Sequence, residues 1–313
     1  MIGKIELGVT GEVVSELALG TMYMGSRMND EASDAVMNTY LALGGTFLDT
    51  ANNYAHWVDG CTGTESEEYL GRWFAKTNKR HDIFLATKVG FDKKGVGKGL
   101  KRRQIIENCE ASLRLLQTDY IDLYYAHTDD RTTSLDETLE AFASLHKAGK
   151  IRYLGASNYT PWRMEMALAL SATKGYPSFI CLQERFTYLK PVPRPLDRFH
   201  IDITDDVMDF ALNKRLTLLA YSPLLQGFYS HPERSVPALY AGDFNDQRLR
   251  VLCEVALEIG GITLNQLVLA WMRRQDAPII PLISGSNTAQ VEENIKCLDI
   301  RLSNEQMERL NQA

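Results

Sequence analysis

The stretch Thr46-Phe-Leu-Asp-Thr-Ala-Asn-Asn-Tyr54 contains the pattern that decides the fold. A short apolar run ends in Asp49, and Tyr54 follows in a polar turn. Two later stretches, Ile83-Phe-Leu-Ala-Thr-Lys88 and Ile121-Asp-Leu-Tyr-Tyr-Ala-His127, also carry a titratable side chain where a strand-like run stops. If the three strands are parallel neighbours, these side chains meet at one edge of the sheet, because the strands all end there.

Short apolar runs alternate with helical patterns along most of the chain. The expected strands are 17–20, 46–49, 83–88, 121–127, 151–156, 179–183, 216–221 and 278–283. The expected helices are 30–43, 65–74, 102–115, 134–148, one beginning at Pro161, 205–212, 247–259, 264–274, 291–297 and a terminal one after Ser303. Residues 222–244 are expected to form a long loop.

Eight strands separated by helices favour right-handed parallel crossovers, and eight such units close into a (β/α)8 TIM barrel. A β-hairpin made by residues 4–7 and 12–15 precedes the barrel, and extra helices follow it near the C-terminus. A doubly wound open sheet is the alternative. The barrel is favoured because barrels carry their chemistry at the C-terminal ends of their strands. Polar residues gather there: Asp49, Lys88, His127, Ser157-Asn158, Gln183-Glu184, Tyr221-Ser222 and Ser284.

The composition is that of an ordinary globular protein, with 45% hydrophobic and 24% charged residues among 313. The net charge of −6 includes no basic block, which argues against nucleic acid or an anionic membrane as the main partner. The five cysteines are widely spaced, so neither a disulfide framework nor a metal site is expected, and a cytoplasmic location is favoured. No run approaches the roughly 18 apolar residues of a membrane span. Residues 1–313 show no linker and are expected to form one domain.

Asp49, Tyr54, Lys88 and His127 together make sense as a proton-transfer site. His127 alone would be better explained as a satisfied core histidine. A phenol is a poor acid at neutral pH, and a buried ammonium at Lys88 would lower the Tyr54 pKa. Asp49 would keep that lysine charged, and a neutral His127 would orient a substrate oxygen. None of these groups is redox-active, so a carbonyl protonated by Tyr54 needs a hydride from a cofactor.

The usual dinucleotide fingerprint is missing. Gly95-Val-Gly-Lys-Gly-Leu100 departs from both the Gly-x-Gly-x-x-Gly and the P-loop patterns, and we interpret it as a loop. A nicotinamide would then lie across the barrel mouth, held by side chains from later strands.

The sequence resembles the aldo-keto reductase family over essentially its whole length. The family's catalytic Asp, Tyr, Lys and His fall on Asp49, Tyr54, Lys88 and His127, within Phe47-Leu-Asp-Thr-Ala51, Ala86-Thr-Lys88 and Asp122-Leu-Tyr-Tyr-Ala-His127. The resemblance implies that Ser157, Asn158 and Gln183 hold the nicotinamide carboxamide and that Tyr221 stacks on its ring. The implied cofactor site comprises Gly20, Thr21, Met22, Asp49, Ser157, Asn158, Gln183, Tyr221, Ser222, Pro223, Leu224, Gln226, Gly227, Ile283, Ser284, Gly285, Ser286, Asn287, Gln290, Glu293 and Asn294.

One departure from the family concerns the cofactor. Many members carry Arg or Lys for the 2′-phosphate, where this chain has the uncharged Ser286, Asn287 and Gln290. Loss of such a cation weakens selection for the phosphorylated cofactor. NADPH is expected from the family's habit, with NADH as the rival. A basic residue of the 222–244 loop, such as Arg234, could also supply the charge.

A second departure is the insert His56-Trp-Val-Asp-Gly-Cys-Thr-Gly63, which precedes the family's Ser-Glu pair. A tryptophan beside polar residues suits a sugar ring, so a sugar or polyol carbonyl is the favoured small-molecule substrate. Trp57 could equally pack the loop onto the barrel rim. The expected substrate contacts are Met24, Tyr54, Trp57 and His127.

Two other functions stay open on the sequence. The family also supplies channel-associated subunits, so the chain could be a cofactor-binding scaffold or sensor with little turnover. A lyase that uses Lys88 as a Schiff base is a more distant alternative. The sequence leaves the physiological substrate, the favoured direction of reaction and the choice between monomer and homo-oligomer open.

Overall fold

The computed structural model of the chain describes residues 1–92, 97–193, 199–231 and 233–313. Gly95 and Val96, from the glycine-rich stretch expected to form a loop, lie outside the described residues. So does Pro195 of the proline-containing loop that precedes the helix expected at 205–212.

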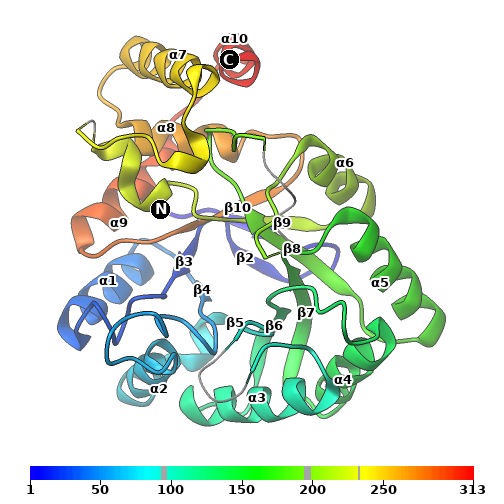
Figure 1. Ribbon diagram of the computed structural model, residues 1–313. Coiled ribbons are helices and arrows are strands. Elements are labelled where there is room, and N and C mark those ends of the chain that lie inside the picture. The colour runs from blue at the N-terminus through cyan, green and yellow to red at the C-terminus, as the bar shows by residue number, and fades with distance from the viewer. Residues whose placement is uncertain (93–96, 194–198, 232) are drawn as a thin grey trace.

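Within the described residues, eight parallel strands close into a barrel in the order β10-β3-β4-β5-β6-β7-β8-β9, and helices surround it (Figure 1). The strands are β3 Ala18–Gly20, β4 Phe47–Asp49, β5 Phe84–Val89, β6 Ile121–Ala126, β7 Ile151–Ser157, β8 Phe179–Arg185, β9 Thr217–Tyr221 and β10 Ile279–Ile283. This confirms the expected (β/α)8 barrel and excludes the open sheet, which would leave two unpaired edges.

The expected hairpin is also present. Strands β1 (Lys4–Glu6) and β2 (Val13–Ser15) pair antiparallel. Leu7 and Val14 belong to the apolar cluster that fills the barrel interior, together with Phe47 and Leu123. The hairpin therefore covers the end of the barrel at which the strands begin, and leaves the opposite end for chemistry.

The helices confirm most of the expected elements, and several begin at the expected caps. They are α1 Asp30–Ala42, α2 Glu65–Thr77, α3 Arg102–Leu115, α4 Leu135–Lys147, α5 Pro161–Lys174, α6 Asp205–Lys214, α7 Asp243–Ile259, α8 Leu264–Met272, α9 Thr288–Ile295 and α10 Asn304–Gln312. The Ser134 hydroxyl accepts a hydrogen bond from the Glu137 N–H at the start of α4, and Ser303 and Gln306 form the expected capping box of α10.

The structure differs from the expected elements at a loop and at several helix ends, such as the end of α2. The segment expected to be a loop contains two short 3₁₀-helices, η2 (Leu225–Ser230) and η3 (Ala238–Tyr240), besides the first residues of α7. Helices α7 and α9 each begin three or more residues before the expected start. The first turn of α7 places Phe244 in solvent and buries Asn245, and that of α9 contains no large apolar residue, so hydrophobic periodicity could not find either start.

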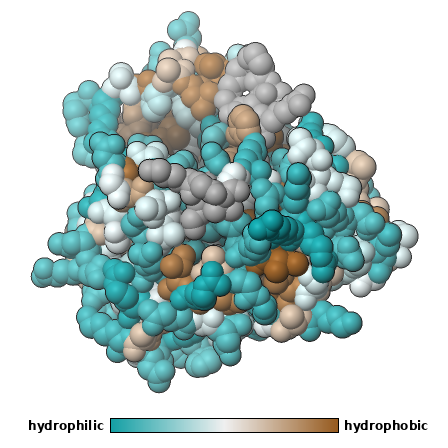
Figure 2. All heavy atoms as spheres, turned by 60° about the horizontal axis from the view of Figure 1, so that its bottom comes forward, coloured by the Kyte–Doolittle hydropathy of each residue, from teal (hydrophilic) through white to brown (hydrophobic). Residues whose placement is uncertain are grey.

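The helices present their polar sides outward. Figure 2 shows a mostly hydrophilic surface on the side that comes forward from the bottom of Figure 1, with hydrophobic areas confined to small patches. Among the described residues no single helix is both long and apolar enough to cross a membrane. Only α7 and α8 taken together, with a bend of 99° between them, pass that test of length and composition.

Candidate active site

Lys88 is the centre of a buried hydrogen-bonded group at the C-terminal end of the barrel. Its ammonium donates to Asp49 Oδ1, to the Tyr54 hydroxyl at 2.6 Å and to the Thr50 carbonyl at 2.8 Å. The side chains of Lys88 and Asp49 are both 0% exposed. An ammonium has three donors, so all of them are used. Strands β4 and β5 pair side by side, which brings Asp49 and Lys88 together as the sequence predicted.

The Tyr54 hydroxyl lies 3.2 Å from Asp49 Oδ1 and accepts from Lys88. Burial and the adjacent Asp49 carboxylate raise the pKa of Tyr54 well above its ordinary value. The expectation that the Tyr54 pKa is lowered is therefore wrong, because burial and the Asp49 carboxylate outweigh the opposite charge of Lys88. Burial also lowers the pKa of Lys88 itself, although Asp49 opposes that shift. The phenol thus keeps its proton at neutral pH, the form in which it can act as an acid.

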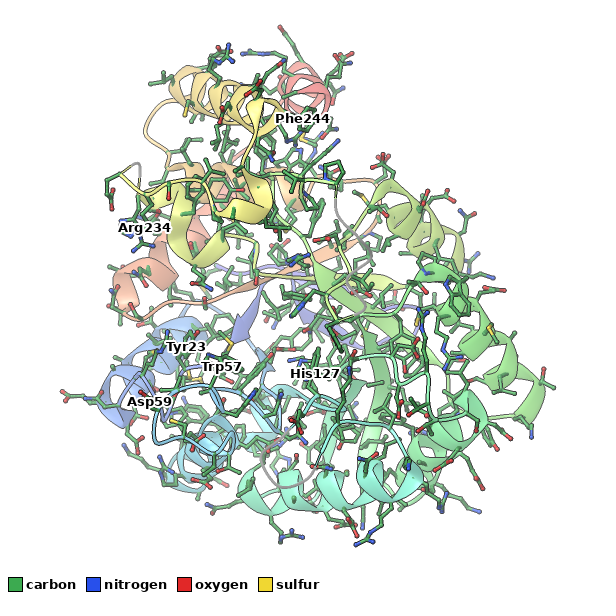
Figure 3. The ribbon with its side chains drawn as sticks, viewed as in Figure 1. Tyr23, Trp57, Asp59, His127, Arg234 and Phe244 are labelled. Atoms are coloured by element: carbon green, nitrogen blue, oxygen red, sulfur yellow. The ribbon has the colours of Figure 1, made fainter. Side chains whose placement is uncertain are left out.

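His127 follows β6 and lies close to Tyr54. Their ring centroids are 6.0 Å apart at an interplanar angle of 76°. Burial and the Lys88 charge hold the pKa of His127 well below its ordinary value, so the ring is neutral at neutral pH. Its Nδ1 has no hydrogen-bond partner among the described residues. Figure 3 places His127 on one side of the barrel mouth, and Tyr23, Trp57 and Asp59 on the other.

The neutral state of His127 predicts how stability depends on pH. Its pKa is lower in the folded chain than the ordinary value of about 6.5 in the unfolded chain, so the unfolded chain binds more protons below that pH. The contribution is complete above pH 6.5 and is lost as the pH falls, by about 1.4 kcal/mol per pH unit. The free energy of unfolding, measured with urea between pH 5 and 7, should therefore depend less steeply on pH in His127→Gln than in the wild type. The same change at the exposed His146 on α4 is the control. Equal slopes in wild type and His127→Gln would contradict a neutral His127.

Gln183 and Asn158 meet the catalytic group from β8 and the end of β7. Gln183 Nε2 donates to Asp49 Oδ2 at 2.8 Å. Asn158 Nδ2 donates to the His127 carbonyl at 3.0 Å, and Asn158 Oδ1 accepts from the Tyr221 hydroxyl at 2.9 Å. Ser157 Oγ lies 3.0 Å from Asn158 Nδ2. The amides expected to face a nicotinamide therefore lie beside Asp49 and His127.

The segment after β9 is a turn with several left-handed residues. Ser222, Leu225 and Gln226 have φ values of 56°, 47° and 57°, and Gly227 has φ 83°. The N–H groups of Leu225 and Gly227 bond to the Ser222 and Leu224 carbonyls inside this turn, so an anion would have to use the remaining N–H groups of the segment. A Cβ added at Gly227 would meet only His231, at 3.7 Å, so the loop faces open space. Pro223 is buried and its carbonyl accepts from Thr187, so it fixes the loop, while Leu224 packs against the core.

The segment after β10 is exposed and uncharged. The Asn287 side chain caps α9 by accepting from the Gln290 N–H, and Gln290 Oε1 accepts from the Ser286 N–H. Asn294 Nδ2 donates to the carbonyl of Ser284. Amides, a left-handed loop and an uncharged helix start fit the chemistry of a nicotinamide dinucleotide, whose anionic groups favour backbone N–H donors. The remaining expected residues at this edge, Ile283 and Gly285, join β10 to that helix start.

Some expected site residues lie elsewhere. Met24 was predicted to contact substrate, but it is 2% exposed and packs in the core between barrel and helices, so that prediction is wrong. Thr21 is 1% exposed and donates its N–H and its hydroxyl to the Asp49 carbonyl, which gives it a supporting position. Its neighbours Gly20 and Met22 are half-buried at the rim. The Glu293 carboxylate accepts from Thr263 at the start of α8.

Two aromatic residues at the mouth were not predicted from the sequence. Phe91, beyond the end of β5, packs edge-on against His127 with centroids 4.6 Å apart. His200 stacks on Phe91 at 6.2 Å and lies 6.5 Å from the Tyr221 ring. Phe91 could have been found by its position just after a catalytic strand. His200 could not, because its segment is held at the mouth by contacts of Ile201 and Asp202 with Arg185, which is distant from His200 in the sequence.

Comparison with known proteins is consistent with this geometry. The model of the Aldo/keto reductase family matches residues 16–313. An uncharacterized oxidoreductase of Bacillus subtilis, YrpG, is 30% identical over 97% of this chain and 94% of its own length. The aldo-keto reductase yakc [NADP(+)] of Schizosaccharomyces pombe is 29% identical, over 95% of this chain and 86% of its own. An aryl-alcohol dehydrogenase of Pestalotiopsis microspora, GME11368, is 25% identical over 96% and 79%. The chain belongs to the aldo/keto reductase family.

Proposed function

We propose that this protein is an NAD(P)H-dependent reductase that converts an aldehyde or ketone to an alcohol. The observation that carries the proposal is the Tyr54 hydroxyl, which accepts from a fully buried Lys88 and is itself only partly buried. A nicotinamide cofactor, when bound, supplies the hydride. Tyr54, Lys88, Asp49 and His127 supply the rest: orientation of the carbonyl and a proton for its oxygen.

The proton step follows from the charges of the site. The substrate oxygen is held by the Tyr54 hydroxyl and by His127, which is neutral and leaves Lys88 as the nearest cation. An alkoxide is a stronger base than a phenolate, so the Tyr54 proton moves to the oxygen once negative charge develops there. The resulting phenolate is stabilised by the Lys88 ammonium at 2.6 Å. The reverse transfer would serve alcohol oxidation.

An absorbance assay at the nicotinamide band, on a panel of carbonyls with both cofactors, tests the function. Turnover of at least one carbonyl supports a reductase. Tight cofactor binding without turnover would favour the scaffold or sensor instead. The lyase alternative is disfavoured because all three donors of Lys88 already have acceptors and its side chain is 0% exposed. An ammonium whose three N–H groups all have acceptors has no lone pair with which to attack a carbonyl.

We propose NADPH as the preferred cofactor, by the family's usage, with NADH close behind. Ser286, Asn287 and Gln290 offer no cation, so the ratio of kcat/KM for NADPH over NADH should stay below about tenfold. Arg234, which donates to the Gln226 carbonyl at 3.3 Å, is the nearest candidate for a 2′-phosphate contact. Arg234→Ala should therefore lower kcat/KM for NADPH and leave NADH unaffected. A strong NADH preference in the wild type would overturn this assignment.

We propose a sugar or polyol carbonyl as the substrate class, on the state of Trp57. This side chain is 48% exposed, and the His56 ring packs edge-on against it at 5.0 Å. The exposed Asp59 lies nearby on the same side of the mouth (Figure 3). A half-exposed indole offers a flat face to a sugar ring, whereas an indole that only anchored its loop would be buried.

Trp57→Ala should raise KM for a hydroxylated aldehyde by about fivefold to tenfold and leave KM for a short aliphatic aldehyde unchanged, because only the former loses a stacking partner. The control is Trp162→Ala, which removes a 53% exposed indole from α5. The panel includes an aromatic aldehyde, because one relative is named an aryl-alcohol dehydrogenase. Equal changes in KM for all three aldehydes would remove the sugar hypothesis.

We further propose that residues 1–313 form one domain and that the protein works in the reducing cytoplasm. Arg248 on α7 donates to the carbonyl of the C-terminal Ala313, which ties the last helix to the body. All five cysteines are free thiols. A single unfolding transition, seen alike by fluorescence and circular dichroism, tests the first of these proposals.

A further inference from the structure

Glu184 is a buried carboxylate that the proton-transfer step does not use. It lies on β8 and is 0% exposed. Oε2 accepts from the Asn158 N–H and Oε1 from the Tyr159 N–H, each at 2.9 Å. Burial raises the pKa of Glu184, and these two bonds oppose that shift. A buried carboxylate is costly unless it is hydrogen-bonded in this way, so both bonds matter to its placement.

The residue that Glu184 holds has an unusual backbone. Asn158 has φ 57°, in the left-handed region that side chains other than glycine rarely occupy, although asparagine tolerates it best. Its N–H is shared between Glu184 Oε2 and, at 3.3 Å, the Gln183 carbonyl, and the shorter bond to Glu184 helps to fix this conformation at the point where β7 ends. The Asn158 side chain is thereby directed back across the barrel mouth instead of continuing the strand.

The Asn158 amide then connects three parts of the candidate site. Its Nδ2 donates to the His127 carbonyl, and its Oδ1 accepts from the Tyr221 hydroxyl and from the Ile201 N–H at 3.2 Å. His127, Tyr221 and the segment that carries His200 come from β6, β9 and the chain beyond β8. One side chain therefore sets the relative positions of groups that lie far apart in the sequence.

We propose that Glu184 is a positioning residue for carbonyl reduction, which acts by holding Asn158 so that its amide fixes His127 and Tyr221. The inference rests on the proposed function for its kinetic consequence, but the hydrogen-bonded chain from Glu184 to His127 does not depend on it. Among the described residues Glu184 donates or accepts no hydrogen bond with Tyr54 or Lys88, so its effect must pass through the residues it holds, Asn158 and Tyr159.

Glu184→Gln is the test variant. A glutamine keeps one acceptor but turns an NH2 group towards the second backbone N–H, so one bond is lost. We expect kcat to fall by roughly tenfold to a hundredfold, because small misplacements of catalytic groups cause losses of that size. Glu16→Gln is the matched control, because Glu16 also accepts from a backbone N–H, that of Gly3, at the opposite end of the barrel. It should lower the Tm and leave kcat unchanged.

A double-mutant cycle separates positioning from general stability. Asn158→Gly keeps the left-handed backbone accessible but removes the amide. If Glu184 acts through Asn158, adding Glu184→Gln to Asn158→Gly causes no further loss of kcat, measured well below every Tm. Multiplicative losses, or a Glu184→Gln enzyme with wild-type kcat, would overturn the inference.

Backbone hydrogen exchange gives a readout that needs no turnover. Glu184→Gln should speed exchange at Asn158 and Tyr159 and also at His127, whose N–H bonds to the Val89 carbonyl. Glu16→Gln should leave all three unchanged. If exchange rises at Asn158 and Tyr159 while His127 keeps its protection, the link to His127 is wrong. A wild type that reduces no carbonyl would sink the proposed function and leave this comparison intact.

Discussion

Tyr54→Phe is expected to lower kcat for carbonyl reduction by about 1,000-fold while cofactor binding stays intact, a loss typical of removing a general acid. The phenol is the group that both keeps its proton at neutral pH and reaches the partly open side of the site. Phenylalanine preserves the ring that packs near His127 and removes only the oxygen. The substrate then has no proton donor at the position where negative charge develops.

Three measurements make this test specific. The rate is followed at the nicotinamide band with saturating cofactor, and the cofactor Kd is measured by quenching of protein fluorescence. Tyr23→Phe removes a phenol hydroxyl from the same end of the barrel and is expected to leave kcat unchanged (Figure 3). A Tyr54→Phe enzyme that retains a tenth or more of the wild-type kcat would show that another group donates the proton.

The part of this site that could be predicted is the part encoded by strand ends. Asp49, Lys88 and His127 each stand at or just beyond the end of a buried strand, and parallel neighbours bring such positions together whatever the loops do. Local patterns also predict where some helices begin, because a serine followed three residues later by glutamate or glutamine is typical of a helix N-terminus. The eight strand–helix units therefore follow from periodicity and caps, and the polar residues at the strand ends favour the barrel over the open sheet.

The failures have a different origin. Met24 lies in a turn, where its own N–H donates to the Thr21 carbonyl. Hydrophobic periodicity does not predict which side chains of a turn face the core. The direction of the Tyr54 pKa depends on how completely the site is buried, which is a property of tertiary packing. Lys88 was expected to dominate. Desolvation and the Asp49 carboxylate outweigh it.

The sequence placed Glu184 at a strand end but did not predict its role, and it did not predict His200 at all, for a third reason. Glu184 follows Gln183 on β8, so the two side chains lie on opposite faces of the strand, and only Gln183 contacts Asp49. The role of Glu184 depends on the strand register that sets Ser157 opposite Gln183. His200 reaches the mouth through the bidentate ion pair of Arg185 with Asp202. Both positions are set by contacts between residues distant in sequence, which a single sequence does not reveal.

Lys88→Met is expected to destabilise the protein by about 3–5 kcal/mol, because it leaves the Asp49 carboxylate buried without its cation. Asp49 would retain bonds from Gln183 and Tyr54 only. The double variant Asp49→Asn/Lys88→Met should recover most of that stability, since it removes the uncompensated charge along with the pair. Activity should be lost in both variants, because neither leaves an ammonium beside Tyr54.

Urea unfolding measures the stabilities, and Arg72→Met is the control because it breaks an exposed ion pair with Asp30. The two side chains of that pair are 51% and 58% exposed, so its loss should change the unfolding free energy by less than about 1 kcal/mol. The decisive comparison is between the single and double variants. If Lys88→Met is no less stable than the double variant, the Asp49 charge is not what Lys88 neutralises. Lys88 would then interact with Tyr54 alone, and the Lys88–Asp49 ion pair would not contribute to stabilising the phenolate.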